Sequence, residues 1–550
     1  MSAHFSNNDI QRLGVQPPEG LRKIVAFRDG VLFVANDYMT SADVIDFELK
    51  LRRMGALSRK QGVSMAQLST HQHEAERVSS LVRRDEAAEK RRAFALLAQG
   101  VKMSASDIHF LIKSSHTEVK FRVDGYLDTY AELSKEEGIQ LVTALYVASD
   151  SNAKSQNQFT FNTPIAARLT RSDGENIGLL PEALYAVRFA SMKTDQGGLV
   201  VLRLLYDSVS SRSAGSETRI DLEALGFTAT QATQLREMAD APNGMIIIDG
   251  PTGSGKSTTL KYTMQWIHEN YPHFNILTVE DPPEYPIIGA SQIPVSVQED
   301  SREQVGERGK QYASIIATTL RLDPDILMVG EIRDGHSAIA GLRAAETGHR
   351  LWSTLHANDA WEAMNRLLDL LREGGMHEPL PVLANTQNLC GMVAQRLVPK
   401  LCPKCRKPFS EFHDRVSQQV RDELFDAIPN LDASTIYVRG DGCDLCVPTA
   451  EGDPEKQRLD KRRGIMGRTV VAEIVRPDQT LLDIARRDGI PAARRYWLKH
   501  RNGQVIADAA LAKILAGVLD PQVAREFVGP LLTARQILSS LEADQMGMIA

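Results

Sequence analysis

The chain has 550 residues, of which 43% are hydrophobic and 24% charged, and its formal net charge is −6. This length predicts roughly two to four domains, and the composition excludes a disordered or fibrous protein. The acidic balance argues against a general nucleic-acid-binding surface, which normally carries an excess of Lys and Arg. We found no apolar run of the roughly 20 residues that a membrane helix needs, and no signal-peptide pattern. We therefore expect a cytoplasmic protein that meets a membrane only peripherally.

The first part of the chain reads as a small domain with a long helix. A strand-like apolar run at residues 24–34 precedes a charge-dense helical stretch that includes residues 83–92. A charge run of this kind is usually the solvated face of a helix. We expect residues 1–100 to form an N-terminal domain that contains this charged helix.

Period-two alternation of apolar residues begins near residue 105. It predicts paired strands at residues 107–110, 119–125, 183–189 and 199–205. Residues 207–218 are rich in serine and poor in apolar side chains, which is typical of a flexible linker. We expect a strand-rich α+β domain over 101–206 and a linker over 207–219.

A phosphate-binding loop follows the apolar run at residues 245–248. Residues 250–257 read Gly-Pro-Thr-Gly-Ser-Gly-Lys-Ser. The glycines let backbone N–H groups converge on phosphates at the positive end of the next helix, the lysine reaches the β and γ phosphates, and the serine hydroxyl binds Mg²⁺. This pattern predicts an ATP site with Mg²⁺, formed by Gly250, Pro251, Thr252, Gly253, Ser254, Gly255, Lys256, Ser257 and Thr258.

Three further polar clusters follow predicted strands. Short apolar runs alternate with helical stretches here, which predicts a mostly parallel sheet covered by helices, with ligands at the carboxyl ends of its strands. Two clusters supply carboxylates suited to Mg²⁺ and to activating a water, and the third places two imidazoles on either side of a strand. Taken alone, these histidines would be ordinary polar residues, and Glu331 could cap a helix. The clusters are 280–284, 330–334, and 347–349 with 353–356.

In this order the motifs resemble those of the secretion ATPase superfamily. Its Walker A, Asp-box, Walker B and His-box signatures resemble Gly-Pro-Thr-Gly-Ser-Gly-Lys-Ser, Val-Glu-Asp-Pro-Pro-Glu-Tyr, Val-Gly-Glu-Ile-Arg-Asp and Thr-Gly-His-Arg-Leu-Trp-Ser-Thr-Leu-His-Ala. Residues 105–125 resemble the strand-rich, PAS-like domain that precedes this ATPase core. The resemblance runs from about residue 105 to 475, and it implies a RecA-like core over 220–396.

The resemblance also implies a biological role. Members form homohexameric rings that convert ATP hydrolysis into work on an inner-membrane platform protein, in type IV pilus assembly or type II secretion. Residues 130–180 match the family poorly, and Pro283 and Trp352 depart from its pattern. The poor match of residues 130–180 points to a divergent branch such as the type IVb pilus systems.

Individual side chains take roles from the same resemblance. Glu331 matches the Walker B carboxylate that serves Mg²⁺, and Glu284 matches the Asp-box glutamate implicated as the base, although which of the two is the base stays open. Arg188 and Arg203 match arginines that reach the nucleotide phosphates, or they pair only with carboxylates of their own domain. The histidines of the His box are His349 and His356.

Four cysteines form two Cys-x-x-Cys pairs. They are Cys402, Cys405, Cys443 and Cys446. Thiolates at this spacing predict a tetrahedral zinc site that stabilises an insertion over 397–472. The alternative is two redox pairs or disulfides, which a reducing cytosol disfavours. The family resemblance adds that assembly and secretion ATPases typically carry this insert, whereas retraction ATPases typically lack it. Cys390 is expected to be an inert thiol.

The last part, residues 473–550, is expected to be helical. Its basic, aromatic stretch at 494–501 fits either a contact with anionic lipid or the platform protein, or a solvated helix face or an intersubunit contact. Two other functions remain open for the whole chain. One is a type IV secretion or conjugation ATPase, and the other is a catalytically silent assembly scaffold.

Overall fold

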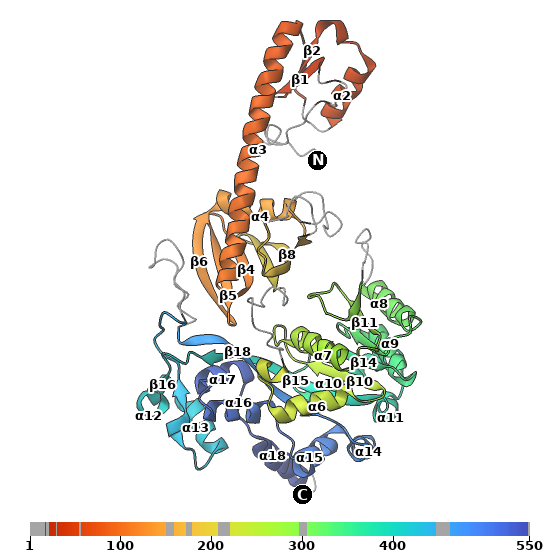
Figure 1. The fold of residues 1–550 in the computed structure, drawn as a ribbon, viewed down its shortest axis with the longest axis vertical. Coiled ribbons are helices and arrows are strands. Elements are labelled where there is room, and N and C mark those ends of the chain that lie inside the picture. The colour runs from red at the N-terminus through yellow and green to blue at the C-terminus, as the bar shows by residue number, and fades with distance from the viewer. Residues whose placement is uncertain are drawn as a thin grey trace. The chain divides into compact units, whose positions relative to one another are not determined.

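The computed structural model describes residues 17, 21, 23–28, 30–53, 57–149, 159–171, 179–206, 221–295, 305–446 and 463–547 (Figure 1). The chain divides into two compact units, one of residues 1–97 with 136–148 and the other of residues 98–135 with 149–550. The predicted linker at 207–218 lies outside the described residues. Within the described ranges, no helix combines the length and apolar character needed to span a bilayer.

The first unit contains a three-stranded sheet. The apolar run at 24–34 forms two strands instead of one, because Gly30 turns the chain with a φ of 74°. The first two strands pair antiparallel and the last two parallel, and Leu32, Val34 and Phe47 pack together in the core. The charge-dense stretch is helical, as predicted, within a helix that continues into the second unit. The elements are β1 Val25–Arg28, β2 Val31–Ala35, η2 Asn36–Tyr38, α2 Ala42–Arg53, β3 Arg59–Val63, α3 Met65–Lys102 and α4 Lys135–Val147.

The second unit begins with an antiparallel six-stranded sheet in the order β6-β5-β4-β9-β8-β7. Alternate residues such as Ile108 and Phe110 are buried, as the period-two pattern predicts. The register places Arg203 opposite both Asp107 and Arg188, so three charged residues lie side by side on neighbouring strands. The strands are β4 Ala105–Ile112, β5 His116–Val123, β6 Tyr126–Ser134, β7 Ile165–Thr170, β8 Leu184–Thr194 and β9 Gly197–Tyr206.

A seven-stranded sheet forms the centre of the same unit, in the order β12-β11-β13-β14-β10-β15-β18. All its neighbouring strands are parallel except β15 and β18. The strands are β10 Gly244–Asp249, β11 Ile276–Glu280, β12 Ala290–Pro294, β13 Ile326–Val329, β14 Arg350–Leu355, β15 Leu389–Leu401 and β18 Ile465–Val475.

Helices cover both faces of this sheet. Ile246 and Ile248 pack on one side with α5, α6 and α7, whereas Met245 and Ile247 pack on the other with α8, α9 and α10. Both faces are therefore apolar, which explains the uninterrupted apolar runs of the parallel strands. The helices are α5 Leu222–Leu225, α6 Ala229–Ala239, α7 Lys256–Asn270, α8 Val305–Thr319, α9 Gly335–Glu346, α10 Ala360–Glu373 and α11 Pro379–Leu383.

The remaining elements lie between β15 and β18 and after β18. The first group is β16 Lys407–Pro408, α12 Phe409–Phe412, η4 His413–Arg415, α13 Gln418–Ala427, η5 Ala433–Thr435 and β17 Tyr437–Val438. The end of the chain is helical, as predicted, with α14 Gln479–Asp488, α15 Ile490–His500, α16 Ile506–Leu515, α17 Pro521–Val528 and α18 Ala534–Gly547.

The basic stretch at 494–501 pairs with acidic residues of its own unit. Arg494 lies 3.3 Å from Asp359, and the Lys499 ammonium lies 2.9 Å from Glu542. Arg501 forms a 2.6 Å ion pair with Asp478. These pairs favour a helix face neutralised within the chain over a lipid-binding patch.

Candidate active site

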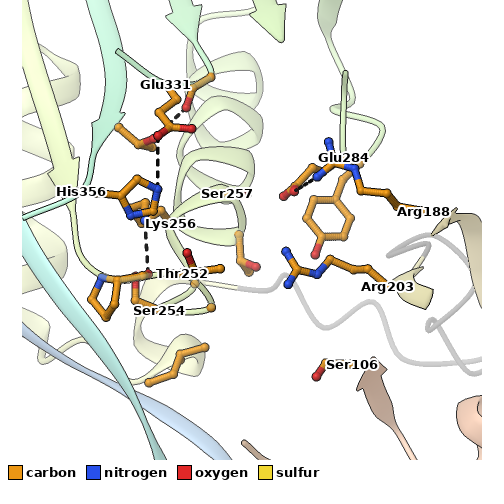
Figure 2. Close-up of a pocket in the computed structure, with 18 of the residues that line it drawn as sticks. Ser106, Arg188, Arg203, Thr252, Ser254, Lys256, Ser257, Glu284, Glu331 and His356 are labelled. Carbon is orange, nitrogen blue, oxygen red and sulfur yellow. Dashed lines mark hydrogen bonds and ion pairs between the residues drawn. The ribbon is translucent and has the colours of Figure 1, made fainter. Parts of the chain in front are cut away.

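A cavity of about 750 Å³ opens at the carboxyl ends of the parallel strands (Figure 2). It lies wholly within the second unit, and its walls come from the phosphate loop, from the segments after β11 and β13, and from the strand-rich sheet. Among the residues predicted from the sequence, it is lined by Arg188, Arg203, Pro251, Thr252, Gly253, Ser254, Gly255, Lys256, Ser257, Thr258, Glu284, Glu331 and His356.

The loop between β10 and α7 has the conformation that its glycines permit. Gly250, Gly253 and Gly255 have φ values of 144°, 80° and 91°, which side-chain-bearing residues rarely adopt. The Lys256 ammonium donates hydrogen bonds to the carbonyl oxygens of Gly250 at 2.6 Å and Pro251 at 3.2 Å. Burial lowers the pKa of Lys256, while the nearby carboxylate of Glu331 opposes this shift. The ammonium is thus held by two carbonyl oxygens of the loop itself, and Lys256 lines the cavity.

Glu331 lies just beyond β13 and is held from two sides. Its Oε2 accepts a hydrogen bond of 2.8 Å from Arg333 Nε, and its Oε1 lies 3.2 Å from His356 Nε2. Arg333 also donates to Asp281 at 3.0 Å and so ties together the segments after β11 and β13. The Glu331 carboxylate therefore has a fixed orientation at the cavity wall.

Glu284 is less constrained. Its Oε1 lies 3.8 Å from Arg188 Nη1, and 28% of its side chain is exposed. The segment that carries it is anchored by Glu280, whose Oε1 accepts hydrogen bonds from Thr278 at 2.7 Å and from Gln292 at 2.9 Å. Glu284 is consequently positioned through its backbone while its carboxylate can still move.

Two arginines reach the cavity from the strand-rich sheet. Arg203 Nε donates to Asp107 Oδ1 at 3.0 Å, and Arg188 Nη2 donates to the Asp281 carbonyl at 3.4 Å. Burial acts to lower the pKa of Arg203, but the Asp107 carboxylate outweighs it and the pKa is raised. Arg203 thus pairs within its own sheet, whereas Arg188 reaches the segment that carries Glu284.

The two histidines of the third cluster lie at opposite ends of β14. His356 follows the strand and lines the cavity, whereas His349 precedes it, with its Nδ1 3.2 Å from the Ala344 carbonyl. A six-residue strand separates its ends by about 20 Å. The structure therefore brings His356, but not His349, to this site. Gly250, at the start of the phosphate loop, is not among the residues that line the cavity.

Several buried polar residues near the site were not predicted. Gln395 on β15 bonds the phosphate loop, Asp249 ends β10 with neither carboxyl oxygen hydrogen-bonded among the described residues, and Glu473 lies on β18. Burial raises the pKa of Asp249 well above its usual value. The sequence feature that could have identified such residues is a polar side chain within an apolar run, as in Ile-Ile-Ile-Asp or Val-Ala-Gln-Arg-Leu.

Glu473 should make stability depend on pH. Burial, together with the Asp359 charge, raises the pKa of Glu473 from 4.5 to about 8. Between these values the folded chain keeps a proton that the unfolded chain has released, so the free energy of unfolding should fall as pH rises, by at most about 1.4 kcal/mol per pH unit. Glu473→Gln lacks this titration. The melting temperature of the variant minus that of wild type should therefore rise between pH 5 and pH 8. The exposed Glu378→Gln is the control, and a pH-independent Glu473→Gln difference would contradict this assignment.

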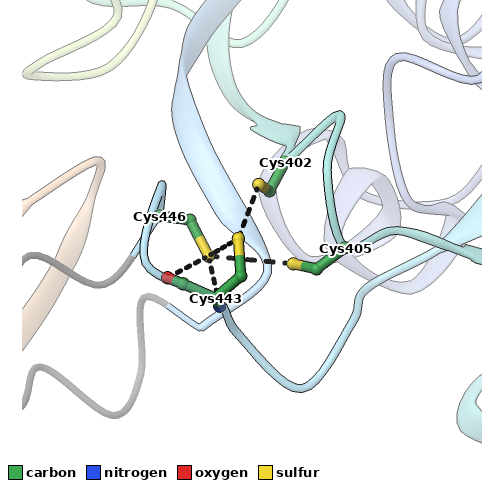
Figure 3. A group of neighbouring side chains, drawn as sticks. All are labelled: Cys402, Cys405, Cys443 and Cys446. Carbon is green, nitrogen blue, oxygen red and sulfur yellow. Dashed lines mark hydrogen bonds between the residues drawn. The ribbon is translucent and has the colours of Figure 1, made fainter.

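The four paired cysteines converge at one point (Figure 3). Cys402 and Cys443 are separated by 3.7 Å between sulfurs, and Cys405 and Cys446 by 3.8 Å, and all four sulfurs lie within 4.8 Å of one another. A tetrahedron with metal–sulfur bonds of about 2.3 Å has edges of about 3.8 Å, whereas a disulfide is about 2.05 Å long. The cluster therefore fits a tetrahedral metal ion and is not disulfide-bonded.

Cys390 stands apart from this cluster. Its thiol donates to the Asn243 carbonyl at 2.9 Å, and burial raises its pKa to about 11. A thiol that stays protonated at neutral pH is a poor nucleophile. Both observations agree with the inert thiol expected from the sequence.

Comparisons with known proteins agree with this architecture. The family described as "Type II/IV secretion system protein" matches residues 83–525. The chain is 33% identical over 424 residues to the type II secretion system protein E of Dickeya dadantii (strain 3937), which covers 77% of this chain and 72% of that protein. It is 32% identical over 426 residues to the type II secretion system ATPase E of Vibrio cholerae serotype O1, with the same shares covered.

A solved structure shares the fold. The Legionella pneumophila ATPase DotB superposes with a TM-score of 0.51 at 19% sequence identity, over 78% of this chain and 93% of that chain. Together with the family match, this confirms the predicted fold class, an α/β ATPase core with a preceding strand-rich domain and a helical C-terminal region.

Proposed function

The chain belongs to the Type II/IV secretion system protein family and is an ATPase, and we propose that it is a homohexameric motor for type II secretion or type IV pilus assembly. In this proposal it works at the cytoplasmic side of the inner membrane, on a platform protein of that membrane. The curated relatives are named for type II secretion, which supports this choice over a conjugation ATPase. The partner and the ring rest on the family resemblance.

One observation carries the proposed chemistry: a single cavity brings together the phosphate loop, two carboxylate-bearing strand ends and two arginines of the preceding domain. Lys256 and the loop N–H groups would bind the β and γ phosphates of ATP. Ser257 and Glu331 would hold Mg²⁺, which would neutralise charge on the phosphates. The residues present fit this ion, because a hydroxyl and a fixed carboxylate are oxygen ligands.

Glu284 would then act as the general base. Its carboxylate would take a proton from a water as that water attacks the γ-phosphorus, while the bond from this phosphorus to the bridging oxygen breaks and ADP leaves with the electron pair. His356 would keep Glu331 oriented through the 3.2 Å contact described above. We give His349 no part in this chemistry.

The two arginines would sense the γ-phosphate. Arg188→Ala and Arg203→Ala should each lose selectivity for ATP over ADP and about 10²-fold in ATP turnover, because the missing contact forms chiefly to the γ-phosphate. Both are expected to keep ADP binding. The measurement is ATP and ADP affinity together with steady-state phosphate release.

Arg171→Ala is a matched control for this prediction. Arg171 lies in the same domain outside the cavity and donates to the Pro181 carbonyl at 3.1 Å. We expect it to behave as wild type. Unchanged affinities and turnover in both cavity variants would show that the two arginines only pair with carboxylates.

A strain lacking this gene tests the motor function. It should lose type II secretion or surface pili, and wild-type protein should restore what is lost while Lys256→Ala should not. Light scattering of the purified chain with Mg²⁺ and an ATP analogue should give the mass of six copies. A deletion strain with normal secretion and piliation, but without conjugative DNA transfer, would favour the alternative function.

A further inference from the structure

Gln395 connects β15 to the phosphate loop. Its side chain is fully buried, and its Nε2 donates to the Ser254 carbonyl at 2.8 Å. Its Oε1 accepts a hydrogen bond from the Thr259 hydroxyl of α7 at 3.0 Å. The amide orientation is fixed, because the Ser254 carbonyl can only accept. One side chain therefore joins a strand, the loop and the helix that follows it.

The backbone of the same residue supports the start of the loop. A Cβ on Gly250 would lie 2.4 Å from the Gln395 carbonyl oxygen, so the loop packs directly on the strand here. A Cβ on Gly255 would lie 3.2 Å from Gln395 Nε2. The glycines at both ends of the loop thus meet this one residue.

The hydrogen bond to Ser254 also sets a direction. In a planar trans peptide, the carbonyl of one residue and the N–H of the next point to opposite sides. Because the Ser254 carbonyl points to Gln395, the Gly255 N–H points away from β15, and Gly255 lines the cavity. We infer that Gln395 is a positioning residue for ATP hydrolysis, which aims the Gly255 N–H at the bound phosphates.

This inference rests on the proposed nucleotide site and predicts a specific defect. An N–H that faces the phosphates binds ADP as well as ATP. Gln395→Met keeps the shape of the side chain but loses both hydrogen bonds, so it should lower the affinity for both nucleotides by at least about tenfold. The arginine variants, in contrast, should affect ATP selectively. Titration calorimetry of the full-length protein with ADP and with a non-hydrolysable ATP analogue, both with Mg²⁺, measures this difference.

Gln231→Met controls for the loss of a buried glutamine. Gln231 also donates from Nε2 to a carbonyl, that of Ala472 at 2.9 Å, and accepts from the Thr228 N–H at 3.1 Å, but neither partner belongs to the phosphate loop or to α7. It should lower the melting temperature without changing either affinity. Thr259→Ser keeps the hydroxyl and should bind both nucleotides with wild-type affinity, whereas Thr259→Val should lower both affinities. In the double variant, Thr259→Val should add little to the effect of Gln395→Met.

Two outcomes would overturn the inference in different ways. If Gln395→Met and Gln231→Met lose similar thermal stability and both bind ADP within about twofold of wild type, Gln395 has only a structural role. If wild-type protein binds no ADP, the proposed nucleotide site itself is wrong, and the role of Gln395 with it.

Discussion

Glu284→Gln should bind Mg-ATP about as tightly as wild type but hydrolyse it about 10²- to 10⁴-fold more slowly. A general base acts in the transition state, so its loss slows the reaction without weakening the ground-state complex. The geometry favours Glu284 because Arg188, at 3.8 Å, leaves its carboxylate free to move. Glu331, bonded by Arg333 and close to His356, suits a ligand that must stay fixed.

Single-turnover hydrolysis by the two glutamine variants distinguishes these roles. Glu346→Gln is the control, because Glu346 is exposed at the end of α9 and does not line the cavity. If Glu284→Gln hydrolysed ATP at a near-normal rate while Glu331→Gln did not, the assignments of base and metal ligand would have to be exchanged.

Loss of one thiolate from the cysteine cluster should unfold the segment between β15 and β18. We expect about one zinc per chain, because a closed four-thiolate site contributes its binding energy directly to folding. Cys402→Ser or Cys446→Ser removes a buried ligand and should abolish zinc binding. Backbone pairing from Met392 with Val475 to Leu401 with Ile465 should keep both strands in the sheet, so nucleotide binding should survive.

Elemental analysis and hydrogen exchange measure these effects. Exchange should rise across the described parts of residues 402–464 and stay low in β15 and β18. Cys390→Ser should keep the metal, since Cys390 lies apart from the cluster. If protein purified under reducing conditions contained no bound metal and had five free thiols, the site would not be a zinc site.

The parts of the site that the sequence predicts are those encoded by short spacings. The phosphate loop and the two Cys-x-x-Cys pairs are local patterns, and the parallel-sheet rule places Glu284 and Glu331 at one edge of the sheet. The same rule also explains why His349 lies away from the cavity, because a residue that precedes a parallel strand lies at the opposite edge of the sheet.

The remaining features depend on pairings between distant segments. Arg203 meets Asp107 only because β9 pairs with β4, 96 residues away in sequence. The Gln395 side chain reaches the Ser254 carbonyl because β15 is the strand next to β10, although the two residues lie 141 positions apart in sequence. No local pattern encodes that strand order, and the sequence pattern predicted the strand at 245–248 but not β15, so the contact of Gln395 with the loop could not be foreseen.

Strand β15 also connects two chemically different regions, the phosphate loop and the cysteine cluster. Cys402 follows Gln395 by seven positions, or about 23 Å at the rise of an extended strand. An extended strand resists stretching, and β18 pairs with this one from Met392 to Leu401. A spectroscopic probe on the exposed Asp444 beside the cysteines would therefore report small displacements that begin at the phosphate loop, without touching the nucleotide.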